Sequence, residues 1–494
     1  MRRSAIIVAA CHCLLSTIAV SAYLRPQSPL ARLHYGASRS SSLLSSPDRR
    51  SFFSKTSTTM AATKPTYDVV VFGATSFAGS LLAEYYLANY GASPPAFKWA
   101  MAGRSETKLA EVKNRLASEV DESASTIPTI IADSMDDEAI ERMVSQAKVV
   151  LTTVGPYGRY GSKLVAACAR AGVHCCDLTG ESTWVEDMID AHHAEAKQTG
   201  AKIVSSCGFD SIPADMGTLM MADHMKRTHG VYPDDVRYFF SENRGGIRQV
   251  SGPGLQRGLP GGTVASILDM CEQLWTGGKA MMKKVNDPLL LAVPPSDGGV
   301  AFKKAGSPGG LGYDSPEKSW TAMSGFASHD SKVVYRSGSI LGYPENFRYK
   351  EVVSFKGLFK GFFPAVITSA VLAIGGVLLF LPLTRKLVAR SLPAPGEGPS
   401  KKDRDNGYFW IDYTAKANVD GKEVVCRGKV GSDKGDCGYK ETAKMLGECG
   451  LCLALDEDRL ENKGGGLLTT ATAMGMPLIE RMRAAGMTFK VLDE

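Results

Sequence analysis

The chain lacks several features that would point to common functional classes. It has only eight histidines in 494 residues, and no histidine or lysine stands out by its context as a catalytic base. The first 60 residues hold eight Lys and Arg and one acid, which is +7, so the +6 of the whole chain leaves −1 on the remainder. Domains that bind nucleic acid usually carry a basic excess. The body of this chain therefore gives no support for nucleic acid as a partner.

Cysteines are also few and form no framework. Nine of the eleven lie after residue 60, an odd number without the spacing of disulfide-rich domains, so we expect reduced thiols. Cys449 and Cys452 form a C-x-x-C pair, but there is no second pair, and both lie in the predicted helical stretch Thr442–Leu455. Core packing is favoured over a redox or zinc role, and no metal site is predicted.

A glycine turn directly follows the first apolar, strand-like run of the body, Tyr67–Phe72, and leads into a helix-forming stretch, Ser80–Tyr90. Such a strand, turn and helix start presents backbone N–H groups and the positive end of a helix to a pyrophosphate. The pattern is G-x-x-S-x-x-G, with serine at the usual middle glycine, so it is weak alone, and a turn without a ligand is the alternative. The predicted cofactor-binding residues of the turn are Gly73, Ala74, Thr75, Ser76, Phe77 and Gly79.

The end of the second predicted strand, Phe97–Ala102, indicates which dinucleotide binds. An acid there would bind the ribose 2′-OH of NAD, but this chain has Arg104 and Ser105. The planar guanidinium of an arginine suits the 2′-phosphate of NADP, so we predict NADP(H) as the cofactor. An exposed arginine at a helix start is the alternative. Asp133, directly after the third strand, is predicted to receive the adenine amino group.

Short β-branched runs recur beyond the second strand, with 15 to 25 residues between them. This spacing predicts βα units and a parallel sheet that is covered on both faces. The predicted strands are Ile127–Ala132, Val149–Val154, Val173–Asp177 and Lys202–Ser205. Ligands bind at the carboxyl ends of such strands, so Gly155 and Pro156 are predicted to form a nicotinamide-side wall. A proline turn that only ends the strand is an equal alternative.

Several blocks taken together resemble the saccharopine dehydrogenase-like oxidoreductases, over about residues 66–494. They are the glycine turn, Ala102–Ser105, Val154–Tyr157, Asp177–Glu181, Cys207–Asp215, Pro395–Ser400, Thr442–Leu446, Ala471–Gly475 and Leu478–Arg481. That group includes trans-acting enoyl reductases of mycobacterial lipid synthesis and an animal protein associated with lipid droplets. Cys437 and Thr470 replace prolines that are more usual in the family, which affects local loop geometry only.

The resemblance implies an NADP(H)-dependent oxidoreductase whose small-molecule substrate is linked to lipid or partitions into membranes. Tyr157 and Asp210 are the candidate catalytic residues, as proton donor or anion stabiliser. The alternatives are that Tyr157 packs and that Asp210 caps the next helix. Two other functions stay open: a soluble saccharopine dehydrogenase or reductase of lysine metabolism, and a non-catalytic nucleotide-binding scaffold on lipid surfaces.

The pattern changes after about residue 210. Residues 231–360 are rich in glycine, with one clear helix after Gly261 and β-type segments at Val236–Ser241, Lys332–Ser337 and Arg348–Phe355. We predict an inserted α/β domain with an open antiparallel sheet. Such a domain commonly contacts substrate and forms dimers, so a homodimer is a further expected partner.

Phe362–Leu383 is a run of 22 residues in which only a threonine and a serine are polar. At about 1.5 Å per residue, it is long enough to cross a hydrocarbon core of about 30 Å. A single crossing would separate the C-terminal tail from the first domain, with which the tail should fold. We therefore predict insertion into a membrane from one side, as an interfacial or bent segment. A single span and a buried core helix are the second and third alternatives.

The N-terminus is predicted to be a targeting sequence. Arg2 and Arg3 precede an apolar run, and a stretch rich in Ser and Arg follows, like a signal peptide with a transit peptide behind it. A signal anchor, or translation from Met60, is the alternative. The expected location is a membrane of the plastid or of the endoplasmic reticulum, or a lipid droplet.

The whole chain is thus predicted to be an α/β protein with a Rossmann-type parallel sheet, an inserted α/β domain and a membrane-associating segment. The predicted units are a presequence (1–60), the NADP-binding domain (61–210), the inserted domain (211–355), the hydrophobic segment (356–390) and a C-terminal region that returns to the first domain (391–494).

Overall fold

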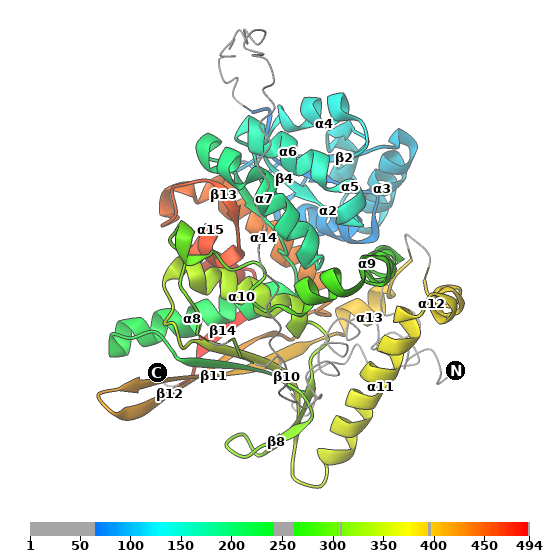
Figure 1. The fold of residues 1–494 in the computed structure, drawn as a ribbon. Coiled ribbons are helices and arrows are strands. Elements are labelled where there is room, and N and C mark those ends of the chain that lie inside the picture. Colours follow the sequence, from blue (N-terminus) through cyan, green and yellow to red (C-terminus); the bar gives the residue numbers. More distant parts are fainter. Residues whose placement is uncertain (1–64, 242–260, 304, 307–308, 394–396, 493–494) are drawn as a thin grey trace, which may run out of the picture.

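The computed structural model describes residues 65–241, 261–303, 305–306, 309–393 and 397–492, which form two seven-stranded sheets (Figure 1). The first sheet lies in the upper half of Figure 1 and the second in the lower half, with helices α8, α10 and α15 between them. The predicted targeting sequence lies outside the described residues.

The first sheet is parallel throughout, in the order β13-β6-β5-β4-β1-β2-β3. All six strands predicted for it are present, with ends that differ by at most two residues, so the Rossmann-type sheet is confirmed. The seventh strand, β13, comes from the C-terminal region. The strands are β1 (Tyr67–Phe72), β2 (Trp99–Gly103), β3 (Thr129–Ile131), β4 (Ala147–Thr152), β5 (His174–Cys176), β6 (Lys202–Val204) and β13 (Gly466–Leu468).

Alternate residues of the central strand β1 enter two separate cores. Val69 and Val71 pack with helices α2, α3 and α14, whereas Val70 and Phe72 pack with α4, α6 and α7 on the opposite face. Burial on both faces explains why β1 is an unbroken apolar run. These helices are α2 (Phe77–Tyr90), α3 (Glu106–Glu119), α4 (Asp137–Val144), α6 (Ser162–Ala171), α7 (Ser182–Thr199) and α14 (Lys440–Leu455), and the short α5 (Tyr157–Tyr160) follows β4.

The second sheet is mixed, in the order β14-β12-β11-β7-β10-β9-β8. The prediction of an antiparallel sheet was wrong because β10 runs parallel to β7, and the long connection between these strands allows that direction. Helices α8 (Ser211–His229), α10 (Ala327–Leu341) and α15 (Thr470–Ala484) pack with it. The strands are β7 (Asp235–Ser241), β8 (Gly312–Asp314), β9 (Ser319–Met323), β10 (Arg348–Lys356), β11 (Phe409–Val419), β12 (Lys422–Ser432) and β14 (Thr488–Val491), so the C-terminal region contributes strands to both sheets.

The predicted strand Lys332–Ser337 was also wrong, because these residues lie in helix α10. The run Val333-Val334-Tyr335 has the β-branched and aromatic residues that favour strands. From Ala327 to Ser339, however, every residue except one is buried, between α8 on one side and β10 on the other. A helix buried on both sides lacks the polar face by which a helix is recognised in a sequence.

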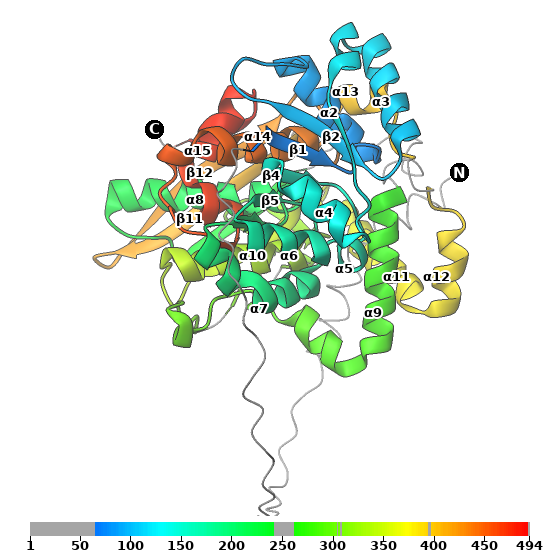
Figure 2. The same cartoon turned by 90° about the horizontal axis from the view of Figure 1, so that it is seen from above.

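Three helices form a layer at one side of the molecule, as Figures 1 and 2 both show. They are α9 (Gly261–Asn286), which confirms the predicted helix, α11 (Phe362–Phe380) and α12 (Pro382–Ala389). In the described part of the chain, α11 is the one helix long and apolar enough to cross a membrane. The short α13 (Lys401–Asp405) follows and leads the chain back to β11.

Candidate functional site

The glycine turn after β1 has the geometry of a dinucleotide loop. Gly73 has φ +85°, in the left-handed region, and its N–H donates to the carbonyl of Ala102 at 2.9 Å. Ser76 caps α2, with its Oγ accepting from the Gly79 N–H at 2.9 Å. The turn therefore holds the N-terminus of α2 at the carboxyl end of β1, where a pyrophosphate binds in such folds.

Two neighbouring strand ends are joined at this turn. Thr153, just past β4, donates its hydroxyl to the Gly73 carbonyl at 3.0 Å, and its Oγ1 lies 2.8 Å from Ser76 Oγ. A Cβ at Gly79 would lie 2.2 Å from the Gly73 oxygen, so only glycine allows α2 to approach so closely. Because the chain proceeds outward from β1 to one side and from β4 to the other, this is the switch point where ligands bind in open α/β sheets.

The remaining turn residues line the same loop. The Ala74 N–H also donates to the Ala102 carbonyl, at 3.1 Å, and Thr75 is half-buried. The Phe77 ring packs edge-on against Tyr439, at 5.4 Å between centroids, and a Cβ at Gly398 would lie 2.4 Å from it. The C-terminal region thus covers Phe77, which the local sequence did not reveal.

The predicted specificity residues lie at successive strand ends. Arg104 is exposed directly past β2, and its guanidinium has no hydrogen-bond or ion-pair partner among the described residues. Ser105 caps α3 by accepting from the Lys108 N–H at 3.3 Å. Asp133 follows β3 and accepts from the Met135 N–H at 2.9 Å. All three residues lie at the carboxyl edge, so the arrangement is compatible with their predicted roles.

The loop after β4 is held by hydrogen bonds rather than left open. Glu181 accepts from the backbone N–H groups of Tyr157 and Gly158, at 2.9 and 2.8 Å. Gly155 and Pro156 precede them, and a Cβ at Gly155 would lie 3.6 Å from Ser266 Oγ of α9. Helix α9 therefore packs against the predicted nicotinamide-side wall.

Tyr157 is 6% exposed, and its phenol joins two strand ends. It donates to the Thr152 carbonyl at 3.3 Å and accepts from the Leu178 N–H at 3.1 Å. Burial, together with the charge of Asp177, raises its pKa well above the ordinary value, which makes it a weaker proton donor. This geometry favours the packing alternative for Tyr157.

Asp210 is half-buried directly before α8 and makes no side-chain capping bond. It lies at the seam where the first sheet meets α10. There, His329 has its Nδ1 2.7 Å from Ser182 Oγ and its Nε2 2.8 Å from Ser206 Oγ. The Ser206 hydroxyl donates to the Thr179 carbonyl at 2.7 Å, so the Nε2 of a neutral His329 carries the ring proton.

The residue after His329 begins a group of buried acids. Asp330 of α10 and Glu351 of β10 are both 0% exposed, and burial raises the pKa of Glu351 to about 7. Asp177, at the end of β5, has its pKa raised by burial to about 6, although three hydrogen bonds oppose the shift. Lys332 is also buried, and burial lowers its pKa to about 8. The carboxyl edge thus carries Asp177, which can hold a proton near neutral pH, and Glu351 and Lys332 add such groups at the seam with the second sheet.

These seam residues were not found from the sequence, for two reasons. Asp330 adjoins a segment that was predicted as a strand, and His329 contacts serines more than 100 residues away. Glu351 gave one usable signal: it alternates with Tyr349 and Val353 on one face of the predicted strand. An acid on a strand face shared with a tyrosine and a valine indicates a buried carboxyl group.

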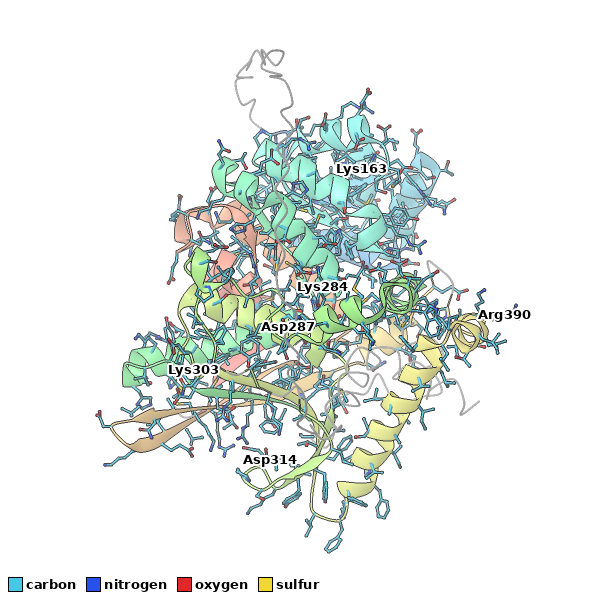
Figure 3. The ribbon with its side chains drawn as sticks, viewed as in Figure 1. Lys163, Lys284, Asp287, Lys303, Asp314 and Arg390 are labelled. Atoms are coloured by element: carbon cyan, nitrogen blue, oxygen red, sulfur yellow. The ribbon has the colours of Figure 1, made fainter. Side chains whose placement is uncertain are left out.

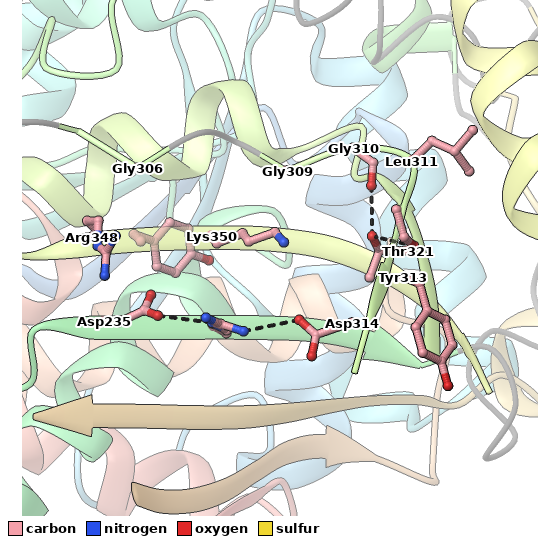
Figure 4. A pocket seen from close by; sticks show the side chains of 13 residues that line it. Asp235, Gly306, Gly309, Gly310, Leu311, Tyr313, Asp314, Thr321, Arg348 and Lys350 are labelled. Atoms are coloured by element: carbon pink, nitrogen blue, oxygen red, sulfur yellow. Dashed lines mark hydrogen bonds and ion pairs between the residues drawn. The ribbon is translucent and has the colours of Figure 1, made fainter. Parts of the chain in front are cut away.

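A separate groove of about 330 Å³ lies on the face of the second sheet opposite to α8 and α10 (Figure 4). In it, Arg237 pairs with Asp235 at 3.0 Å and with Asp314 at 3.1 Å. None of its lining residues belongs to the first sheet or its loops, so it is no part of the dinucleotide site.

The chain is similar in sequence to known proteins. Residues 69–204 match the family model of the saccharopine dehydrogenase NADP-binding domain. A protein of Mycobacterium tuberculosis is 36% identical to this chain over 448 residues, which cover 87% of this chain and 99% of that protein. The chain belongs to the saccharopine dehydrogenase-like family. A further relative in it, a trans-acting enoyl reductase of Mycobacterium bovis, is 35% identical over 439 residues, covering 86% of this chain and 98% of the relative.

Solved structures include the apo saccharopine dehydrogenase (L-Glu forming) of Saccharomyces cerevisiae, with a TM-score of 0.47 and 13% identity, covering 86% of this chain and 100% of that one. Membership of the saccharopine dehydrogenase-like family makes this protein an NADP-binding oxidoreductase. The turn fits a nicotinamide dinucleotide, because only glycine at positions 73 and 79 lets the N-terminus of α2 lie so close to β1. A Cβ at either position would collide with Thr153, Val154 or the Gly73 carbonyl. A bound dinucleotide supplies hydride chemistry at this edge.

Proposed function

We propose that the protein is an NADPH-dependent enoyl reductase that acts on a lipid-linked, α,β-unsaturated substrate at a membrane or lipid-droplet surface. One observation carries the proposal: a single helix, α9, joins the loop beside the dinucleotide turn to an exposed apolar helix. The reaction class is supported by the Mycobacterium bovis relative, which is named a trans-acting enoyl reductase.

Helix α9 contacts the loop after β4 with one face and helices α11 and α12 with the other. Asp269 pairs with Arg159 of the β4 loop, with Arg159 Nε 2.6 Å from Asp269 Oδ1, and Ser266 packs near Gly155. On its other face, Ile267 and Cys271 pack with Leu379 of α11 and Val388 of α12. A substrate chain in a lipid phase beside α11 would therefore be one helix away from the predicted nicotinamide-side wall.

Helix α11 lies along the protein rather than projecting from it. Near its N-terminus, Ala365 packs with Phe355 and Ala322 of the second sheet. Near its C-terminus, the ring of Phe380 contacts Trp275 of α9 at 5.2 Å between centroids. Protein flanks the helix at both ends, so it is poorly placed to span a bilayer, and insertion into one leaflet from the side is the topology we propose.

The outer face of the layer formed by α9, α11 and α12 exposes a contiguous apolar surface, which is unfavourable in water. The exposed apolar residues of the loop before α11, of α11 itself and of α12 define a lipid-facing surface: Leu358, Phe359, Phe362, Phe363, Ile367, Ile374, Val377, Leu381, Leu383 and Leu387. Arg385 and Lys386 lie between its last two leucines and Arg390 lies just after them, and cations near lipid headgroups strengthen binding to anionic membranes. A membrane is the occupant that matches an apolar surface with a basic edge.

NADPH is preferred over NADH in this proposal because Arg104 is exposed at the end of β2 and has no carboxylate partner there. The prediction of a plastid, endoplasmic-reticulum or lipid-droplet location depends on the pattern of residues 1–60. The prediction of a homodimer depends on the domain that holds the second sheet. Both stay predictions.

The test is NADPH oxidation by the purified full-length protein with the N-acetylcysteamine thioester of trans-2-decenoic acid in mixed detergent micelles. We expect oxidation with this probe and none with its saturated analogue. Gly79→Val, whose side chain would collide with the Gly73 carbonyl, should lose nucleotide binding and turnover together. Reduction of NADP by saccharopine instead would favour the lysine-metabolism alternative, and a wild type that binds no nucleotide would favour the scaffold.

A further inference from the structure

Two carboxyl groups meet in the interior at the seam between the sheets. Asp330 comes from the first turn of α10 and Glu351 from the middle of β10, and both are 0% exposed. Helix α10 packs against β10, which brings the two buried side chains to the same part of the interior, and each carboxyl group acts on the pKa of the other. No part of the proposed function has used them.

Three neutral hydroxyl groups of the described residues donate hydrogen bonds to the pair. Glu351 accepts from Ser324 Oγ at 2.5 Å and from the Tyr349 phenol at 3.0 Å. Asp330 Oδ1 accepts from Ser211 Oγ at 2.8 Å, whereas Asp330 Oδ2 has no hydrogen-bond partner among the described residues. One acceptor of this buried pair is therefore left without a donor.

A single shared proton resolves this arrangement. Two ionised carboxylates side by side in a buried site repel each other, and burial alone already disfavours each charge. Burial comes first among the causes that raise the pKa of both groups, followed for Asp330 by the charges of Glu351 and Asp210. A proton between the two groups removes one charge and supplies the missing donor to Asp330 Oδ2, as in other coupled carboxyl pairs.

Asp210 connects the pair to the carboxyl edge of the first sheet. It is the residue before Ser211, which bonds Asp330, and its charge acts on both acids of the pair. It is half-buried, and a Cβ at Gly180 would lie 4.0 Å from its Oδ2. Gly180 and Asp210 follow β5 and β6, so this carboxylate lies on the side where the cofactor-binding loops end.

We propose that the Asp330–Glu351 pair holds one proton between its carboxyl groups and delivers it through Asp210 to the substrate reduced at the carboxyl edge. This inference rests on the proposed function. Reduction of a C=C bond needs a hydride, which bound NADPH supplies to one carbon while becoming NADP, and a proton for the other carbon. The pair gives up that proton, becomes doubly ionised, and takes another from water through Asp210. Asp330 and Glu351 are thus positioning residues, and Asp210 is the group nearest the substrate.

Other ionisable groups surround the pair and enter any pH dependence. The phenols of Tyr238 on β7 and Tyr413 on β11 feel the charges of both acids. Lys332, two residues along α10, has its pKa lowered by burial and partly restored by the charges of Asp287 and Asp330. The phenols stay neutral at physiological pH, and Lys332 donates to Ser328 instead. Burial also raises the pKa of Asp177 and of Asp436 to about 6, so the carboxyl variants are needed to assign the steps that belong to the pair.

The first readout does not involve activity. Infrared titration of the full-length protein without nucleotide should show two carboxyl steps: one as the pH rises through about 7, the value for Glu351, and one at higher pH, because burial and the charge of Glu351 raise the pKa of Asp330 well above its ordinary value. Glu351→Gln and Asp330→Asn should each leave one step in place of two, because a single buried acid remains. Tyr349→Phe should keep both steps but move them upward by about 0.4 to 1 pH unit, since one hydrogen bond to the ionised pair is lost.

The second readout is the pH profile for reduction of the decenoyl thioester. Activity requires one proton on the pair, so it should fall as the pH rises through the upper infrared step, where that proton is lost. Tyr349→Phe should shift this fall by the same amount as it shifts the midpoint of that infrared step. Tyr86→Phe, which removes a buried phenol that bonds the Gly447 carbonyl far from the pair, should leave both midpoints unchanged.

The outcomes separate the two proposals. Activity without any carboxyl titration near neutrality, or an infrared shift in Tyr349→Phe that the activity profile does not follow, would overturn the role of the pair and leave the enoyl reductase in place. A carboxyl pair that titrates in a protein unable to reduce the probe would overturn the proposed reaction, and with it the delivery of the proton. Should the carboxyl variants fail to fold, Tyr349→Phe and Ser324→Ala still decide, because both acids remain.

Discussion

Helices α14 and α11 are both apolar and both come from the later part of the chain, but their surroundings differ. Every residue of α14 from Glu441 to Ala454 is buried, although the helix carries three charged residues in that range. Helix α11 carries no charge at all, yet only Ala365, Leu372, Gly375, Gly376 and Leu379 are buried. The more polar helix is thus the one inside the protein.

The charges of α14 are tolerated because each has a partner. Lys444 donates to Glu441 at 2.9 and 2.8 Å, and Glu448 accepts from the phenols of Tyr85 and Tyr90 at 2.7 and 2.6 Å. Helix α11 has no charged residue to pair, but most of its apolar side chains have no protein packed against them. The comparison teaches that this protein covers α14 completely, whereas it leaves most of the apolar surface of α11 exposed.

A charged residue introduced into each helix tests whether α14 is buried and α11 is exposed. Leu451 of α14 is 0% exposed and Ile374 of α11 is 58% exposed. Leu451→Asp buries an unpaired carboxylate, so we expect a loss of more than about 4 kcal/mol in the free energy of unfolding, against at most about 0.5 kcal/mol for Ile374→Asp. Urea unfolding of both variants in one mild detergent measures the difference. Equal losses would mean that protein covers α11.

The same surface should control binding to lipid. The double variant Ile367→Asp and Ile374→Asp removes two apolar side chains, 61% and 58% exposed, from the lipid-facing surface. Each loss should cost about 1 to 2 kcal/mol of partitioning, so vesicle binding in a flotation assay should fall roughly 30-fold or more. NADPH affinity should not change. Val425→Asp, an exposed apolar site on β12, is the control, and an equal loss of lipid binding there would refute the assignment.

The dinucleotide end of the molecule should respond in the opposite way. Arg104→Ala should weaken NADPH binding by about 1.5–3 kcal/mol, or roughly 10- to 150-fold, because a charge-assisted bond to the 2′-phosphate is lost. NADH affinity and vesicle binding should stay the same. Fluorescence titration with both nucleotides measures this, with Arg142→Ala, at an exposed position of α4, as the control. A similar loss for NADH would show that Arg104 does not read the phosphate.

The smallest expected effect concerns the cations beside the lipid-facing surface. Lys386 lies in α12, and Arg390 lies at its end, at the margin of the molecule in Figure 3. Replacing each by glutamine should weaken binding to anionic vesicles by about 1 kcal/mol, or about 5-fold, and less at high salt. Binding to neutral vesicles should not change. If neutral vesicles lose the protein equally, the effect is on folding of α12.

Local patterns carried much of the fold. The strands of the first sheet were found because runs such as Tyr67–Phe72 are apolar, short and followed by turn residues. The glycine turn gave the place of the dinucleotide, and the close approach at Gly79 agrees with the role that its glycine suggested. These features depend on neighbours in the chain, so no distant contact was needed to predict them.

Features made by distant contacts were missed or left open. Helix α10 was taken for a strand because α8 and β10 bury both of its sides. The pairing of β7 with β10 was given the wrong direction because strand direction depends on the path of a long connection. Tyr157 and Asp210 were both proposed as catalytic groups, yet the structure ties the Tyr157 phenol to two strand ends and leaves Asp210 beside the buried acids.

The sequence by itself determined the parallel sheet, the dinucleotide turn, the arginine at the end of β2 and the existence of a long apolar segment. Those are properties of residue order within a few turns or strands. Only the tertiary structure decided that Asp330 and Glu351 meet, that the C-terminal region completes both sheets, and that α11 lies along the protein with one face uncovered. Ser211 and Asp330, for example, are 119 residues apart in the chain and 2.8 Å apart between their side-chain oxygens. Such contacts follow from how whole elements pack, because burial and charge pairing are set by neighbours in space.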